Sequence, residues 1–120
     1  MRDMTGISEL RFVVLPAVLS VTLHAHAILA SAVPAAGQVV QGPEVSIRLR
    51  FNSRIDGKRS RVLLVAPDGT TSVLPVADQS APDSLETAAN KLKTGSYTIR
   101  WQVLANDGHI TRGEIPFRVK

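Results

Sequence analysis

Hydrophobic and polar residues alternate along several short stretches of the chain. The clearest stretch is 45–52, in which the hydrophobic positions are Val45, Ile47, Leu49 and Phe51. A period of two residues is typical of a β-strand that buries one face. The same period runs through 96–104 and 115–119. The faces of these strands carry the aromatic residues of the expected core: Phe51, Tyr97, Trp101 and Phe117.

The remaining segments also favour strands. Two apolar runs, 61–66 and 71–76, flank Pro67-Asp68-Gly69 and predict a hairpin. A first strand is expected near 28–33, and 84–90 fits either one short helical turn or an edge strand. No segment has a helical stripe over three turns, so we predict a single all-β domain, a sandwich or barrel. We expect the loop Gln79–Ser84 to be flexible.

The N-terminal segment has the order of a secretory leader. Phe12–Leu23 is an apolar run of about a dozen residues, shorter than the roughly 20 residues of a membrane-spanning helix. We therefore predict a cleaved signal peptide. Small residues favour a cut after Ala27 slightly, whereas a cut after Ala25 makes His26 the first residue of the mature chain.

Composition narrows the chemistry that the domain can perform. The chain has no Cys, and its two Met residues fall in the leader. A disulfide scaffold, a thiolate metal site and an iron–sulfur cluster are therefore excluded, and only nitrogen and oxygen ligands remain for a metal.

The chain carries a formal net charge of +4. Its basic residues include Arg48 and Arg50 on one strand face, followed by Lys58, Arg59 and Arg61. They predict a solvated basic face, with anionic lipid or an acidic partner as alternatives. We expect no nucleic-acid partner, because an exported domain without surface aromatics lacks the usual means of binding one.

The two histidines left after leader removal are His26 and His109. Asp107 and His109 are separated by one residue, which lets both side chains approach one point at a strand end. Asn106-Asp107-Gly108 also fits an ordinary turn, with His109 as a surface residue. An N-terminal His offers its α-amine and its imidazole to one metal ion. Together with a second imidazole and a carboxylate, these groups suit tetragonal Cu(II).

Several motifs occur in order along 26–120. They are His26-Ala27-Ile28-Leu29, a Ser-x-x-Pro-x-x-Gly turn from Ser31 to Gly37, Leu49-Arg50-Phe51, the Leu92–Tyr97 turn, and a C-terminal block with Trp101-Gln102-Val103, Asp107-Gly108-His109, Gly113 and Phe117-Arg118-Val119. The set resembles the copper resistance protein C (CopC) family of periplasmic copper-binding proteins. The resemblance implies a seven-stranded Greek-key β-barrel or sandwich, immunoglobulin-like or cupredoxin-like. It also implies cleavage between Ala25 and His26, and Cu(II) ligands at His26, Asp107 and His109.

Three positions depart from the family pattern. The methionine-rich Cu(I) loop of some members is missing, which suggests a Cu(II)-only protein. Asn52-Ser53-Arg54 stands where many members carry an acidic residue, and Gly108 replaces the commoner Thr between the two ligands.

We therefore expect a leader at 1–25 and a mature copper-binding domain at 26–120. The resemblance implies a periplasmic, monomeric, non-enzymatic Cu(II) carrier or buffer, with an inner-membrane copper transporter of the CopD type as its partner. Two alternatives stay open at this point. One is a metal-free immunoglobulin-like interaction module, and the other is a copper monooxygenase built on an N-terminal histidine chelate.

Overall fold

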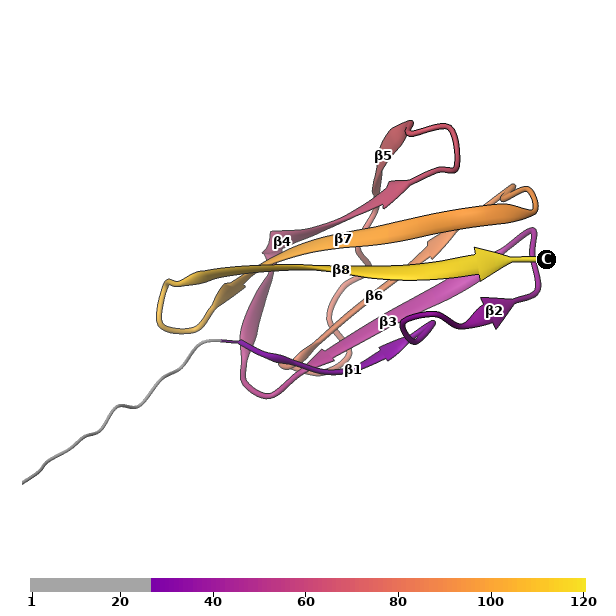
Figure 1. The fold of residues 1–120 in the computed structure, drawn as a ribbon. Helices are drawn as coiled ribbons and strands as arrows, with labels where there is room; N and C mark the ends of the chain where they lie inside the picture. Colours follow the sequence, from indigo (N-terminus) through magenta and orange to yellow (C-terminus); the bar gives the residue numbers. More distant parts are fainter. Residues whose placement is uncertain (1–26) are drawn as a thin grey trace, which may run out of the picture.

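The computed structural model describes residues 27–120 as two β-sheets packed face to face (Figure 1). One sheet has the strand order β1–β3–β6 and the other β2–β8–β7–β4–β5. The strands are β1 (Leu29–Val33), β2 (Val39–Val40), β3 (Val45–Phe51), β4 (Ile55–Val65), β5 (Thr71–Leu74), β6 (Ser84–Ala89), β7 (Gly95–Ala105) and β8 (Ile110–Val119). The prediction of an all-β sandwich is confirmed. In residues 27–120 we find no helix long and apolar enough to cross a membrane.

The strands differ from the expectation in number and in length. Residues 27–120 form eight strands, whereas the resemblance implied seven. The additional strand is the short β2, whose two residues pair in parallel with the end of β8. The segment 84–90 contains a strand rather than a helical turn, and β6 pairs with β3 at an edge of the three-stranded sheet.

The space between the sheets is filled by the predicted alternating residues. Every second residue of β3, from Val45 to Phe51, is buried, and the residues between them are exposed. The Phe51 and Trp101 rings meet edge to face, with centroids 5.1 Å apart. Tyr97 stacks on Phe117 at 5.7 Å. All four aromatic residues predicted for the core are buried.

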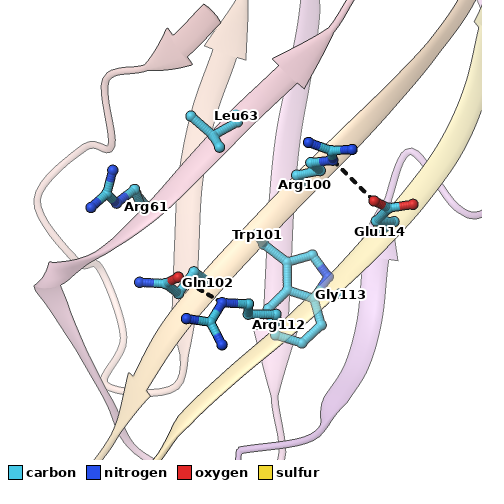
Figure 2. A pocket seen from close by; sticks show the side chains of 8 residues that line it. All are labelled: Arg61, Leu63, Arg100, Trp101, Gln102, Arg112, Gly113 and Glu114. Atoms are coloured by element: carbon cyan, nitrogen blue, oxygen red, sulfur yellow. Dashed lines mark hydrogen bonds and ion pairs between the residues drawn. The ribbon is translucent and has the colours of Figure 1, made fainter. Parts of the chain in front are cut away.

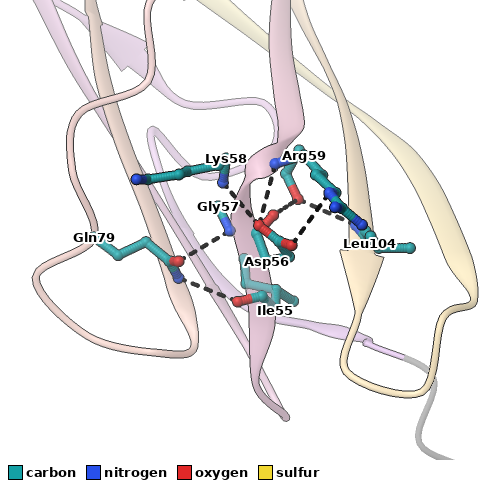
Figure 3. Close-up of polar contacts among 8 residues, drawn as sticks. Ile55, Asp56, Gly57, Lys58, Arg59, Gln79 and Leu104 are labelled. Carbon is teal, nitrogen blue, oxygen red and sulfur yellow. Dashed lines mark hydrogen bonds and ion pairs between the residues drawn. The ribbon is translucent and has the colours of Figure 1, made fainter.

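Strand β4 begins at Ile55, well before the predicted run 61–66. Its pairing with β7 is irregular between Asp56 and Arg61, and side-chain hydrogen bonds hold this segment in place (Figure 3). The Asp56 carboxylate accepts two backbone N–H groups of the irregular segment, at 3.1 and 3.2 Å. The Ser60 hydroxyl donates to the Asp56 carbonyl and accepts the Leu104 N–H. Beyond the irregularity, Ile55 still pairs with Ala105. The turn between β3 and β4 is thereby kept beside the end of β7.

The loop before β6, for which we predict flexibility, is joined to β4 by the hydrogen bonds of Gln79. The side-chain oxygen of Gln79 accepts the Gly57 N–H at 2.9 Å, and its amide donates to the Ile55 carbonyl at 3.4 Å (Figure 3). A Cβ at position 57 would lie 2.6 Å from Cγ and Cδ of Gln79. Glycine at this position therefore makes room for the side chain that holds the loop.

The hairpin predicted from Pro67-Asp68-Gly69 connects β4 to β5. Asp68 accepts the Thr70 N–H at 2.9 Å. This hydrogen bond favours the charged carboxylate and lowers the pKa of Asp68 below its ordinary value.

Candidate functional site

The turn between β7 and β8 carries two of the three predicted ligands, Asp107 and His109. The Ala105 N–H donates to the His109 carbonyl at 2.8 Å, and the Gly108 N–H donates to the Ala105 carbonyl at 3.0 Å. Gly108 has a φ of +89°, in the left-handed region that glycine enters without a steric penalty. Residues 106–108 thus form the turn that their composition favours, and this turn brings the two candidate ligands together.

Asp107 contacts His109 through both carboxylate oxygens. Oδ1 accepts the backbone N–H of His109 at 3.0 Å, and Oδ2 lies 2.7 Å from Nδ1 of its imidazole. The His109 side chain is 61% exposed and that of Asp107 is 27% exposed. A carboxylate at Nδ1 orients the ring and favours the tautomer whose lone pair is on Nε2. The pair is therefore arranged as an oriented, solvent-accessible nitrogen ligand.

The turn between β3 and β4 links the start of β1 to this pair. Asn52 Oδ1 accepts the Ile28 N–H at 2.8 Å, and the Asn52 N–H donates to the Ile28 carbonyl at 2.9 Å. In the same turn, the Arg54 carbonyl accepts the Asn106 N–H at 3.2 Å. Figures 1 and 3 both show the start of β1, the β3–β4 turn and the β7–β8 turn at one end of the sandwich.

His26, the third predicted ligand, lies outside the described residues, as does the predicted leader. Ala27 directly follows it and is fully buried, with 0% of its surface exposed. Among residues 27–120, no three His, Cys, Asp or Glu side chains are grouped closely enough to hold a metal ion. The described part of the candidate site is thus the Asp107–His109 pair.

Asn52 was not among the predicted site residues, although it holds the chain next to the candidate ligands. Its signal in the sequence is the departure at Asn52-Ser53-Arg54, where many family members carry an acidic residue. The role becomes visible only with the pairing of β1 and β3, in which Leu29 lies opposite Phe51. The neighbouring Ser53 hydroxyl is buried and has no hydrogen-bond partner among residues 27–120, so the two adjacent residues play different parts.

These features define a class of protein: a small two-sheet β-sandwich with an exposed Asp-x-His turn at one end. Residues 29–120 match the CopC domain, and the chain belongs to the CopC family. The family resemblance found in the sequence is confirmed.

Relatives match over most of their length. The chain is 33% identical to protein YobA of Escherichia coli K12 over 104 residues, which cover 84% of this chain and 82% of YobA. It is 29% identical to copper resistance protein C of Xanthomonas campestris pv. juglandis over 109 residues, covering 84% and 85% of the two chains.

Solved structures share the fold. CopC from Methylosinus trichosporium OB3b is similar with a TM-score of 0.71 at 28% identity, covering 79% of this chain and 94% of that one. PcoC, a methionine-rich copper resistance protein from Escherichia coli, gives a TM-score of 0.68 at 29% identity. The match covers 80% of this chain and 100% of PcoC. The family and its named relatives connect this domain with copper resistance.

Proposed function

We propose that the protein is exported and binds one Cu(II) ion, which it buffers or carries in the periplasm for copper resistance or homeostasis. The ligands are the α-amine and imidazole of His26 at the mature N-terminus, together with Asp107 and His109. The observation that supports this most directly is the Asp107–His109 contact of 2.7 Å, on a turn bonded to the same short loop that holds Ile28. We propose no catalytic role.

The donor set favours Cu(II). An amine, two imidazoles and a carboxylate are nitrogen and oxygen ligands, and Cu(II) lies at the top of the divalent affinity order for such sites. PcoC is described as methionine-rich, whereas the methionines of this chain are Met1 and Met4. A mature chain that begins at His26 has no sulfur ligand for Cu(I).

The contact between Asp107 and His109 allows two arrangements of a copper site. The Asp107 oxygen that lies 2.7 Å from His109 Nδ1 gives up that contact if it ligates the metal. If it keeps the contact, Asp107 instead holds the ring while Nε2 ligates. In both arrangements copper displaces protons from its nitrogen ligands, so we expect the affinity to fall as the pH is lowered.

The proposal requires a signal peptide at 1–25 that is cut between Ala25 and His26. One observation supports this position over a cut after Ala27. Ala27 is a fully buried core residue, and a cut after it would remove it from the domain. The mature domain is then 26–120, a monomer whose membrane partner, implied by the resemblance, is a copper transporter of the CopD type.

Calorimetric titration of the exported protein with Cu(II) tests the proposal. Mass spectrometry of the same sample must first show that the chain starts at His26. We expect one tight site, weakened about a hundredfold or more by His26→Ala or by His109→Ala, since even the outer partner of a ligand contributes roughly 10- to 100-fold.

The chain offers a matched control in Asp68→Asn. Asp68 and Asp107 both lie in hairpin turns, and each accepts the N–H of the residue two positions later. We expect Asp107→Asn to weaken copper binding and Asp68→Asn to leave it unchanged. A chain starting at Ile28, or equal copper binding by the wild type and both His variants, would overturn the proposal.

A further inference from the structure

The two sheets differ in how their outward-facing arginines are neutralised. On the three-stranded sheet, Arg48 lies 2.9 Å from Glu86, and Arg50 lies 3.6 Å from Asp83. The basic face predicted from Arg48 and Arg50 is therefore compensated by acidic side chains in β6 and just before it. Uncompensated positive charge lies instead on the outer face of the five-stranded sheet.

Six outward-facing residues of β4, β7 and β8 form two neighbouring rows across this sheet. Strand register places Arg61, Gln102 and Arg112 in one row and Leu63, Arg100 and Glu114 in the next. We call these six residues the arginine groove. They line a hollow of about 490 Å³, which Trp101 and Gly113 also border (Figure 2).

The positive charge of the arginine groove is only partly compensated. Arg100 Nε donates to Glu114 at 3.0 Å, and Arg112 Nε donates to the Gln102 side-chain oxygen at 2.9 Å (Figure 2). Within residues 27–120, no carboxylate forms an ion pair with Arg61 or Arg112. Two exposed guanidinium groups, one on each side of Gln102, are thus left for an anionic partner.

We propose that the arginine groove docks an extended acidic segment of a partner protein. Arg61 and Arg112 lie on the two strands that flank β7, so their backbones are about 10 Å apart, twice the usual strand spacing. An extended segment in the polyproline II conformation covers about 9 Å in three residues and brings side chains i and i+3 to the same face. A Glu-x-x-Glu segment therefore places one carboxylate on each arginine, where charge-assisted bidentate hydrogen bonds form.

The shape of the surface favours a peptide over a membrane. Leu63 is only partly exposed and provides an apolar wall for an aliphatic side chain between the two carboxylates. A bilayer surface is flat on this scale and would not fill the hollow. This docking does not depend on copper binding, since the arginine groove contains none of the proposed ligands.

The experiment uses the acetylated peptide Ser-Glu-Leu-Ala-Glu-Ser and a counterpart with both Glu replaced by Gln. Trp101 is the single tryptophan of the chain and borders the hollow, so its fluorescence reports on occupancy. Amide chemical shifts in NMR spectra map the contact. We expect saturable binding of the Glu peptide, shifts centred on β4, β7 and β8, and binding that weakens as salt is added.

A variant pair on each sheet separates docking from general charge attraction. Arg61→Gln with Arg112→Gln should weaken peptide binding about tenfold or more, because two charge-assisted hydrogen-bond partners are lost. Arg48→Gln with Arg50→Gln removes the same charge from the other sheet and should leave binding within about twofold.

Three results would overturn the proposal. The first is equal weakening by both variant pairs, and the second is binding of the Gln peptide as tight as that of the Glu peptide. The third is no peptide binding together with Arg61- and Arg112-dependent binding to vesicles of phosphatidylglycerol and phosphatidylcholine in a 3:7 ratio.

Discussion

Asn52 bonds twice to Ile28, which lies two residues after the proposed ligand His26. Ordering a backbone residue costs about 1–2 kcal/mol in conformational entropy. Because Ala27 is buried and Ile28 is hydrogen-bonded, folding already orders the backbone beside His26 before copper binds. We therefore regard Asn52 as a positioning residue of the proposed site, although it is not one of the proposed ligands.

Replacement of Asn52 by Ala tests this role. The side-chain acceptor of the Ile28 N–H is lost, and the start of the chain becomes less ordered. We expect copper affinity to fall about tenfold while the free energy of unfolding falls by only about 1 kcal/mol, the usual contribution of one hydrogen bond. Calorimetry and urea denaturation measure the two quantities.

Two further variants distinguish positioning from a general loss of stability. Asn52→Asp keeps an oxygen acceptor and should retain most of the copper affinity. Ser53→Ala alters the same turn but removes a hydroxyl that has no partner in the described part of the chain, so affinity and stability should both stay near wild type. Unchanged affinity in Asn52→Ala would show that Asn52 does not position the site.

At the scale of elements, the β7–β8 hairpin supports both the candidate site and the arginine groove. Trp101 and Gly113 are partners in its register, and the Trp101 side chain is buried. A Cβ at position 113 would lie 2.5 Å from Cε2 and 2.8 Å from Nε1 of Trp101. The indole is held against Phe51 and has little freedom to move away. Glycine at 113 is thus required by the ring beside it.

Gly113→Ala should destabilise the protein by about 1–3 kcal/mol, the usual range for an overpacked core. Urea denaturation followed by circular dichroism measures the change. In a Trp101→Phe background the smaller ring leaves space, so the same substitution should cost less. An equal cost in both backgrounds would mean that the contact with Trp101 is not the cause.

Alternation in the sequence predicted several strands, and the turn residues Pro67-Asp68-Gly69 predicted the hairpin between β4 and β5. The inward residues of β3 and β7 follow from the two-residue period alone, because one buried face is enough to produce it. The beginning of β4 could not be predicted, since Asp56 and Ser60 close an irregularity that breaks the period. Asp107 and His109 became candidate ligands through the resemblance to the family, because their spacing alone also fits an ordinary turn. The role of Asn52 was not predicted, because it depends on which strands pair.

At the scale of the whole molecule, the two parts of the proposed site come from opposite ends of the domain sequence. His26 precedes β1, whereas Asp107 and His109 lie between the last two strands. The β3–β4 turn joins them by hydrogen bonds to Ile28 and to Asn106. These contacts exist only when both sheets have assembled, so the site and the fold form together.

The proposed copper site therefore predicts that copper binding and folding are linked by mass action. The amine and imidazole of His26 are adjacent in the chain and can chelate copper in the unfolded protein, but the complete site exists only in the folded one. At a free copper concentration about 100 times the dissociation constant, a ligand specific for the folded state adds about 2.7 kcal/mol. For a domain of this size, that raises the melting temperature by about 10 °C or more.

Differential scanning calorimetry with and without Cu(II) checks this linkage. We expect His109→Ala to abolish most of the rise, since its remaining chelate binds folded and unfolded chains alike. An equal rise in wild type and His109→Ala would break the link between the β7–β8 turn and copper. If the link holds, a newly exported chain acquires its full copper affinity only after folding. Tight copper binding then reports that the two sheets have packed together.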